Sequence, residues 1–249
     1  MTQDDSSRVY EVRSLEVAAE LPRYHDWLMR SFRPHLRGRV IEVGAGIGTV
    51  AADYVGSVQS ALLVEPANNL HERLAARFAA NANVKTACAT LEEVCAGKVV
   101  GVRAEAGTFD TAIMVNVLEH IEDDGGVLRQ LEALLQPAGK LLIFVPAVPF
   151  LFGALDRRVG HVRRYTRSTL LDVVRRSGFE VEELRYFDLL GMVPWFITGR
   201  VLRQATVGTG SAQFYDQFIV PLCQAVDVIT QRPLGKNLIC VARKHGARA

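Results

Sequence analysis

Three glycines at alternate positions have the type and spacing that point most directly to ligand binding. Gly44, Gly46 and Gly48 follow an apolar run that contains Glu42. Because these positions carry no side chain, the backbone there can approach a ligand, and the amides of a following helix point outward. A second acid, Glu65, ends the next apolar run, where its carboxylate is placed to accept hydrogen bonds from a ribose diol. The pattern predicts a ligand that contains a nucleoside.

The spacing of the glycines departs from the dinucleotide fingerprint. G-x-G-x-x-G would require a third glycine at position 49, where this chain has Thr49. The observed G-x-G-x-G therefore disfavours an NAD(P)-dependent oxidoreductase, which is the chief enzymatic alternative.

His161 is the predicted catalytic base for any reaction in which an acceptor must lose a proton. It follows the fifth predicted strand, near the strand ends where ligands bind in α/β sheets, and imidazole exchanges protons near neutral pH. The alternative is a structural or substrate-orienting role within an arginine-rich loop.

That loop, residues 156–167, contains five arginines and one acid. Arginine binds phosphate and carboxylate groups in bidentate fashion, so the loop could hold an anionic acceptor. The alternative is that Asp156 and other carboxylates pair some of the arginines and that water solvates the rest. We predict substrate contacts from Arg164 and Tyr165, and from Trp195 in a later apolar segment.

Asn116, Glu119 and His120 form an N-x-x-E-H array after the fourth predicted strand. Such an array could hold a divalent ion, but an amide at position 116 is a weaker ligand than a carboxylate, and we predict no metal. The four cysteines form no C-x-x-C pair, which indicates reduced thiols.

Short apolar runs alternate with helix-like stretches, which is the pattern of a parallel sheet covered by helices on both faces. The predicted strands are 39–44, 60–65, 83–89, 109–116, 139–145, 179–187 and 237–243. The predicted helices are 48–56, 66–80, 90–97, 122–136, 168–178, 189–204 and 214–230. Asp123 and Asp124 are expected to cap the fourth of these helices, and residues 136–139 to end it.

Charge is divided unevenly along the 249 residues. Residues 1–150 carry 14 Lys and Arg against 19 Asp and Glu, whereas residues 151–249 carry 15 against 8. A composition that is 49% hydrophobic excludes a disordered chain. The longest uncharged run, 141–155, is too short and too broken by prolines to span a bilayer, and the N-terminus lacks an apolar signal region. We expect a cytoplasmic protein.

These motifs strongly resemble those of the class I S-adenosylmethionine-dependent methyltransferases. E-x-G-x-G-x-G, the acid that ends the second strand and N-V-L-E-H-I after the fourth occur here in the family's order and spacing. In finer detail the chain resembles the small-molecule branch, which includes ubiquinone-biosynthesis-type enzymes. The segments LDRRVGHVRRYTRSTL and GFEVEELRYFDLLG also resemble bacterial methyltransferases whose substrates are suspected to be sugars or lipids. The resemblance implies an α/β fold: a Rossmann-like, seven-stranded, mostly parallel sheet with helices on both faces, an antiparallel last strand and a helical insertion before it.

The resemblance also implies the cofactor, S-adenosylmethionine, and its product, S-adenosylhomocysteine. Gly44, Gly46 and Gly48 would line its methionine side, Glu65 would hold the ribose hydroxyls, and Asn116 would lie beside the methionine portion. The family usually has an Asp near position 90 for the adenine. Here Thr90 or backbone amides would replace it, and Glu42 would either contact the cofactor or organise the loop. The remaining predicted cofactor contacts are Ala45, Pro66 and Leu91.

No repeat or low-complexity linker divides the chain, so we predict a single domain over 1–249. It would comprise an N-terminal helical cap (1–36), a cofactor-binding core (39–145) and acceptor-side lid segments (146–167 and 188–235). The expected partner is a small-molecule acceptor, either anionic or partly apolar, and the 188–235 segment is alternatively a helical layer or a homodimer contact. No nucleic acid is expected, because Asn116-Val117-Leu118-Glu119 stands where amino-methylating DNA enzymes carry Asn-Pro-Pro-Tyr.

The predicted function is methyl transfer to a hydroxyl oxygen of a sugar, lipid-linked or other natural-product substrate by in-line displacement. The alternatives are methyl transfer to carbon or nitrogen of a small molecule, the oxidoreductase named above, and a non-catalytic cofactor-binding scaffold.

Overall fold

The computed structural model describes residues 21–102, 104–202, 209–229 and 233–246. Its centre is a sheet of seven strands in the order β3-β2-β1-β4-β5-β7-β6. The strands are β1 (Arg39–Val43), β2 (Ser60–Val64), β3 (Val84–Ala87), β4 (Phe109–Val115), β5 (Leu135–Pro146), β6 (Phe179–Phe187) and β7 (Asn237–Lys244). Strand β7 runs antiparallel to both of its neighbours, and the other pairings are parallel. The predicted fold class is confirmed.

Strands β1, β2 and β4 and the second half of β5 are mainly apolar because both faces of the sheet are covered, whereas the edge strand β3 is partly polar. On one face, Leu128 and Leu131 of one helix and Leu170 of another pack over the strands. On the other face, Trp27 and Leu74 fill the equivalent layer. The main helices are α2 (Pro22–Phe32), α3 (Ala51–Tyr54), α4 (Asn68–Phe78), α5 (Leu91–Cys95), α6 (Asp124–Leu134) and α8 (Arg167–Arg176).

Several helix limits differ from those predicted. The first helix after the glycine loop covers only Ala51–Tyr54, and β5 begins at Leu135, immediately after α6 ends. The segment 136–139, predicted to be a turn, belongs to β5, with Ala138 in a left-handed conformation (φ 62°). Asp123 caps α6 as predicted, since its Oδ1 accepts from the Gly126 amide at 2.8 Å.

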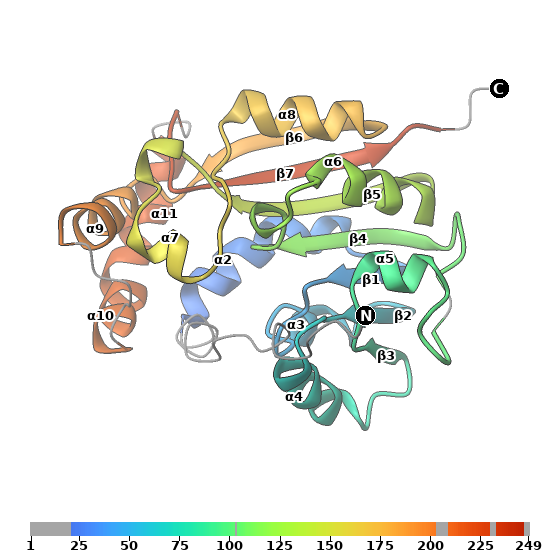
Figure 1. Ribbon diagram of the computed structural model, residues 1–249. Helices are drawn as coiled ribbons and strands as arrows, with labels where there is room; N and C mark the ends of the chain where they lie inside the picture. Colours follow the sequence, from blue (N-terminus) through green and yellow to red (C-terminus); the bar gives the residue numbers. More distant parts are fainter. Residues whose placement is uncertain (1–20, 103, 203–208, 230–232, 247–249) are drawn as a thin grey trace, which may run out of the picture.

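The insertion lies beyond the carboxyl ends of the parallel strands (Figure 1). It contains α9 (Met192–Phe196), α10 (Thr209–Phe214) and α11 (Val220–Ile229). Two π-helical turns lie within the stretches predicted as helices: η5 (Ile197–Val201) falls inside 189–204, and η6 (Tyr215–Ile219) falls at the start of 214–230. The short α7 (Ala154–Arg158) stands at the same end of the sheet.

A buried carboxylate of the insertion caps helix α2. Oδ1 of Asp216 accepts from the Tyr24 amide at 2.8 Å, and Oδ2 accepts from the Arg23 amide at 3.1 Å. These amides would otherwise lack partners at the helix start. The bond therefore ties the N-terminal helix to a segment about 190 residues later; residues 1–20 of the predicted N-terminal cap lie outside the described residues.

Candidate active site

A cavity of about 1550 Å³ opens at the carboxyl ends of β1, β2, β4 and β5. Its walls come from the glycine loop, the segment after β5, helix α2 and the insertion. Ligand pockets usually measure about 300–1,000 Å³, so this cavity has room for more than one molecule.

The glycine loop forms one wall through Gly44, Ala45 and Gly46. Gly44 has φ 70°, and a Cβ there would lie 2.3 Å from Cγ2 of Val117. Gly48 is required for a different reason. A Cβ at this position would lie 2.4 Å from Cε2 of Phe78, and Gly48 is not among the residues that line the cavity. The structure therefore places Gly48 against helix α4, which does not support its predicted cofactor contact.

Glu65 lies at the cavity edge, and both of its carboxylate oxygens hold the backbone. Oε2 accepts from the Gly46 amide and Oε1 from the Ala67 amide, each at 2.9 Å. Burial raises the pKa of Glu65 above its ordinary value. The carboxylate thus fixes the loop, and its remaining lone pairs are available to a ligand.

Glu42 also reaches the cavity wall, where its Oε2 accepts from the Tyr54 hydroxyl at 2.7 Å. Burial raises the pKa of Glu42 to about 8. The bond to helix α3 fits the role of an organiser of the loop.

Pro66, Thr90, Leu91 and Asn116 all line the cavity, as the sequence predicts for cofactor contacts. Thr90 caps helix α5: its hydroxyl accepts from the Glu93 amide, and its own amide donates to the Glu93 carboxylate. Asn116 is a non-glycine residue with φ 53°, a sparsely populated conformation that is enriched at functional sites.

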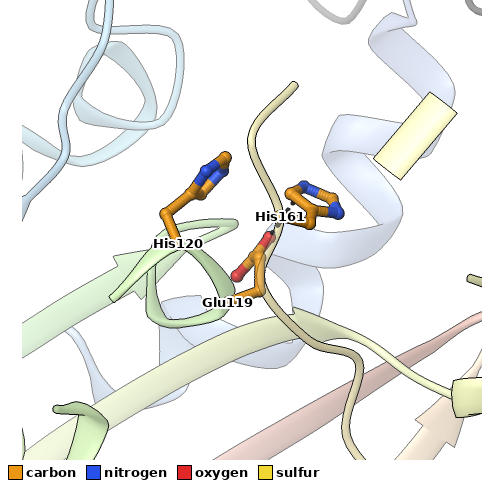
Figure 2. Close-up of side chains that lie close together, drawn as sticks. All are labelled: Glu119, His120 and His161. Atoms are coloured by element: carbon orange, nitrogen blue, oxygen red, sulfur yellow. Dashed lines mark ion pairs between the residues drawn. The ribbon is translucent and has the colours of Figure 1, made fainter. Parts of the chain in front are cut away.

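His161 lies at the cavity wall between two carboxyl groups. Its Nδ1 is 2.9 Å from Oδ1 of Asp156, and its Nε2 is 3.6 Å from Oε1 of Glu119. Figure 2 shows Glu119 close to the rings of His161 and His120, whose centres are 4.7 Å apart in an edge-to-face arrangement. Both oxygens of Glu119 are buried without a hydrogen-bond partner in the described part of the chain, and burial raises its pKa to about 8.

Asp156 connects His161 to Arg164. The Nε of Arg164 donates to the same Oδ1 at 2.8 Å, and the amide of Gly153 donates to Oδ2 at 2.9 Å. Burial by itself raises the pKa of Asp156, but the bonds from His161 and Arg164 outweigh it and hold the pKa below its usual value. Asp156 is therefore an ionised carboxylate within the fold.

Among the residues that the structure describes, Glu119, His120 and His161 each offer one atom that could bind a metal ion, and these three atoms lie within 4.8 Å of one another. The Nδ1 of His120 lies 3.2 Å from the Gly160 carbonyl oxygen, and burial together with His161 lowers the pKa of His120 to about 4. The predicted absence of a metal stays a prediction.

The predicted substrate residues separate into two groups. Arg164 and Trp195 line the cavity, with the guanidinium 5.0 Å from the centre of the indole ring. Tyr165 does not line it; its side chain is buried in the core, and its hydroxyl donates to Oδ2 of Asp124 at 2.8 Å. This placement does not support the predicted substrate contact of Tyr165.

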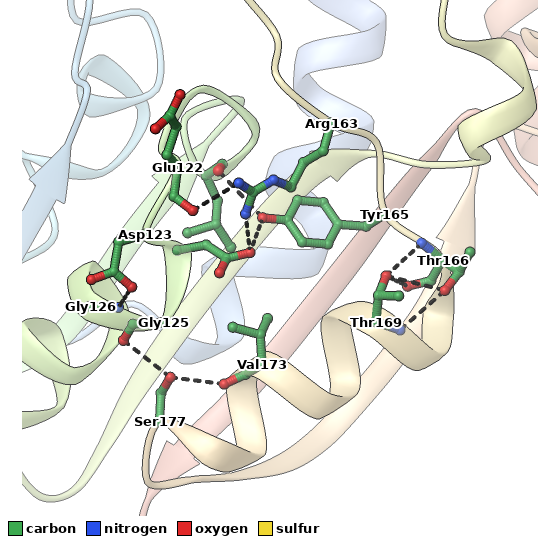
Figure 3. Close-up of polar contacts among 12 residues, drawn as sticks. Glu122, Asp123, Gly125, Gly126, Arg163, Tyr165, Thr166, Thr169, Val173 and Ser177 are labelled. Carbon is green, nitrogen blue, oxygen red and sulfur yellow. Dashed lines mark hydrogen bonds and ion pairs between the residues drawn. The ribbon is translucent and has the colours of Figure 1, made fainter.

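The remaining arginines of the loop differ in how far they are exposed. Arg163 pairs with Asp124 at 2.6 Å and donates to the Glu122 carbonyl oxygen, which anchors the loop at the start of α6 (Figure 3). Arg157 and Arg167 are exposed, and Arg158 is exposed at the cavity wall.

A second charged pair, which is not among the predicted site residues, lies at the inner wall. Nζ of Lys236 is 2.8 Å from Oδ2 of the buried Asp188 and 4.9–5.7 Å from the ring centres of Tyr24, Tyr215 and Trp195. Asp188 directly follows β6 and Lys236 directly precedes β7, and these strands are antiparallel neighbours. The strand order could therefore have revealed the pair.

Comparison with known proteins gives one family and a set of similar folds. A model of the family described as methyltransferase domain matches residues 16–184. The YcgJ protein of Bacillus subtilis has a TM-score of 0.60 at 15% identity, with 90% of this chain and 100% of that one covered. An S-adenosylmethionine-dependent methyltransferase of Mesorhizobium loti has a TM-score of 0.60 at 18% identity, with 91% and 98% covered.

Phosphoethanolamine N-methyltransferase 2 of Haemonchus contortus, solved with phosphomonomethylethanolamine and S-adenosylhomocysteine, has a TM-score of 0.59 at 17% identity. That match covers 89% of this chain and 52% of the nematode protein. No curated protein sequence matches the chain significantly. At identities below 20%, the structural likeness concerns the fold alone.

Proposed function

Because the chain belongs to the methyltransferase domain family, we propose that it transfers the methyl group of S-adenosylmethionine to a hydroxyl oxygen of a small-molecule acceptor. The observation that carries the hydroxyl assignment is His161, a histidine on the cavity wall whose Nδ1 is held by Asp156 at 2.9 Å. An alcohol must lose a proton when it is methylated, and a positioned imidazole is suited to accept that proton.

The strand-end half of the cavity fits the cofactor. Glu65 lies at the end of β2 with lone pairs for ribose hydroxyls, the loop residues Ala45 and Gly46 bring the backbone to the cavity, and Leu91 supplies an apolar wall. Asn116 would contact the methionine portion. When bound, S-adenosylmethionine supplies a methyl group on a sulfonium, which leaves by in-line displacement.

The protein's contribution at the acceptor is a hydrogen-bonded base. Asp156 accepts the Nδ1 proton of His161, which leaves Nε2 with the lone pair that removes the acceptor proton. As the acceptor oxygen bonds to the methyl carbon, the carbon–sulfur bond breaks, the acceptor proton passes to Nε2, and S-adenosylhomocysteine is the product.

The protonation state of the Glu119 carboxyl group decides whether Nε2 of His161 is available to accept the acceptor proton. With a pKa of about 8, Glu119 holds a proton at neutral pH, so its carboxyl group 3.6 Å from Nε2 is uncharged. An ionised carboxylate there would instead accept a hydrogen from Nε2, and a ring nitrogen that carries a hydrogen has no lone pair for the acceptor proton. Burial of Glu119 thus supports the role of His161.

Trp195 and Arg164 are the proposed contacts to the acceptor. The Trp195 Nε1 is buried without a hydrogen-bond partner among the described residues, although the side chain lines the cavity. A buried indole N–H normally has an acceptor, which an oxygen of the substrate would provide. Arg164 lies beside the ring and adds positive charge to this wall.

Transfer of a tritiated methyl group from S-adenosylmethionine to a panel of sugars, phenols and lipid-linked alcohols tests the proposal. We expect His161→Ala to lower turnover about 10²- to 10⁴-fold and to leave the affinity for S-adenosylhomocysteine nearly unchanged. His71→Ala is the control, since His71 lies on α4, where it contacts Thr86. Unchanged turnover in His161→Ala would remove His161 as the base, and failure to bind S-adenosylhomocysteine in calorimetry would overturn the proposed function.

A further inference from the structure

The cavity has a polar inner wall and an apolar opening on the side of the insertion. Two cations line the cavity there, and each is paired with a buried carboxylate: Arg164 with Asp156 and Lys236 with Asp188. Toward the insertion, the lining residues are mainly aliphatic and aromatic, from Leu190 to Leu222. A molecule that fills this space therefore meets polar groups at one end and hydrocarbon at the other.

Three large apolar side chains mark the opening, because they line the cavity and are also more than half exposed. These residues, which we call the mouth residues, are Val193 (60% exposed), Phe214 (57%) and Leu222 (53%). They come from α9, α10 and α11, so all three α-helices described in the insertion contribute. The apolar lining of the cavity thus continues onto the protein surface.

The exposed apolar surface extends from the mouth residues along the π-helical turns η5 and η6. Ile197 and Val201 are exposed beside Val193, and Phe218 is exposed with its ring 5.1 Å from that of Phe214. A freely soluble, polar acceptor would leave these side chains in water, where large apolar patches are uncommon unless they bind something. These two turns also place Thr198 and Tyr215 in the cavity wall. π-Helical turns occur frequently at functional sites.

The volume of the cavity agrees with a polar inner part and an apolar outer part. At about 1550 Å³, the cavity exceeds the usual range for one ligand, so the cofactor leaves space that reaches the mouth residues. A small polar head near His161 would occupy only the inner part of that space.

From these observations we propose that the acceptor is an amphiphile. Its hydroxyl-bearing head lies between His161 and Trp195, and its hydrocarbon chain leaves the cavity across Val193, Phe214 and Leu222. This inference rests on the proposed function, since it places the acceptor hydroxyl at the proposed base.

Calorimetry with a series of n-alkyl β-glucosides tests the proposal, using the full-length protein with and without S-adenosylhomocysteine. The probes run from ethyl to decyl glucoside, each below its critical micelle concentration. We expect the dissociation constant to fall about two- to fourfold for each added methylene, because each one moves from water into the apolar channel. A dissociation constant that does not change with chain length would overturn the proposal.

Two variants of helix α11 test where the hydrocarbon chain of the acceptor contacts the protein. Leu222→Ser should weaken decyl glucoside binding at least about fivefold and leave ethyl glucoside and S-adenosylhomocysteine binding unchanged. Ile229→Ser is the control, because Ile229 is on the same helix and 79% exposed but is not among the cavity-lining residues. Equal effects of the two substitutions would overturn the proposed path, and Phe214→Ser provides an independent second test.

The design separates the two proposals from each other and from self-association. Chain-length-dependent binding without any S-adenosylhomocysteine binding would overturn the proposed function and leave the apolar channel in place. Analytical ultracentrifugation could instead show a dimer that Leu222→Asp dissociates. Together with no binding of decyl glucoside, that result would identify the mouth residues as an interface between copies of the protein and overturn the proposal of an amphiphilic acceptor.

Discussion

Nδ1 of His161 and Oδ1 of Asp156 lie 2.9 Å apart, and the Asp156 oxygen also accepts from Nε of Arg164 at 2.8 Å. One buried carboxylate therefore sets both the tautomer of the proposed base and the position of a cation beside the acceptor space. The arrangement resembles other catalytic histidines whose far nitrogen is held by a carboxylate.

Asp156→Asn should lower turnover about 10²- to 10⁴-fold, because an amide can donate to Nδ1 and stabilise the wrong tautomer. The measurement is kcat at saturating S-adenosylmethionine across pH 6–9. Asp156 is a positioning residue, so binding of S-adenosylhomocysteine should stay within about twofold of wild type. Glu122→Gln, an exposed substitution, is the control. A loss that appears only in KM, with kcat and its pH profile unchanged, would contradict this role.

Activity should fall as pH rises through about 8, because the ionised Glu119 carboxylate then competes with the acceptor hydroxyl for Nε2 of His161, 3.6 Å away. The direction follows from the raised pKa of Glu119, which is neutral below that value and charged above it. A pH profile of kcat for the wild type and for Glu119→Gln checks this, since glutamine cannot ionise. If both proteins lose activity with the same midpoint, Glu119 does not control the alkaline limb.

Much of the fold could be predicted from the sequence, because buried parallel strands are apolar runs that end at recognisable turns. The two π-helical turns could not, since Ile197–Val201 and Tyr215–Ile219 mix apolar and polar residues in the same way as the helices around them. The early start of β5 was missed because Ala138 takes a left-handed conformation that usually marks glycine.

Tyr165 shows why neighbouring residues in a motif need not share a site. Tyr165 forms an isolated parallel β-bridge with Ala147, so the backbone at Arg164 and Tyr165 is extended. Successive side chains on extended backbone point in opposite directions, so Arg164 reaches the cavity and Tyr165 enters the core. Sequence proximity to His161 could not distinguish the two residues without the position of that bridge.

Gly48→Ala should destabilise the protein by about 2–4 kcal/mol in urea unfolding. The left-handed backbone (φ 79°) costs about 1–2 kcal/mol for a residue with a Cβ, and the clash with Phe78 adds a similar amount. Gly97→Ala is the matched control, because Gly97 also has positive φ (68°) but its Cβ would have nothing within 4 Å. Equal losses in the two variants would show that Phe78 moves aside at little cost.

Glu42→Gln should stabilise the cofactor-free protein increasingly as pH rises from 5 to 8. The folded state raises the pKa of Glu42 to about 8, so folding favours the protonated carboxyl group. Wild-type stability is therefore complete below the ordinary carboxyl pKa and is lost as pH rises toward 8, whereas glutamine stays neutral and can still accept from Tyr54. We expect the difference in unfolding free energy between Glu42→Gln and wild type to grow by about 2–4 kcal/mol over this range. Urea titrations at pH 5, 6.5 and 8 provide the measurement, with Glu122→Gln as the exposed control. A difference that stays constant with pH would mean that Glu42 ionises inside the folded protein as readily as it does in water.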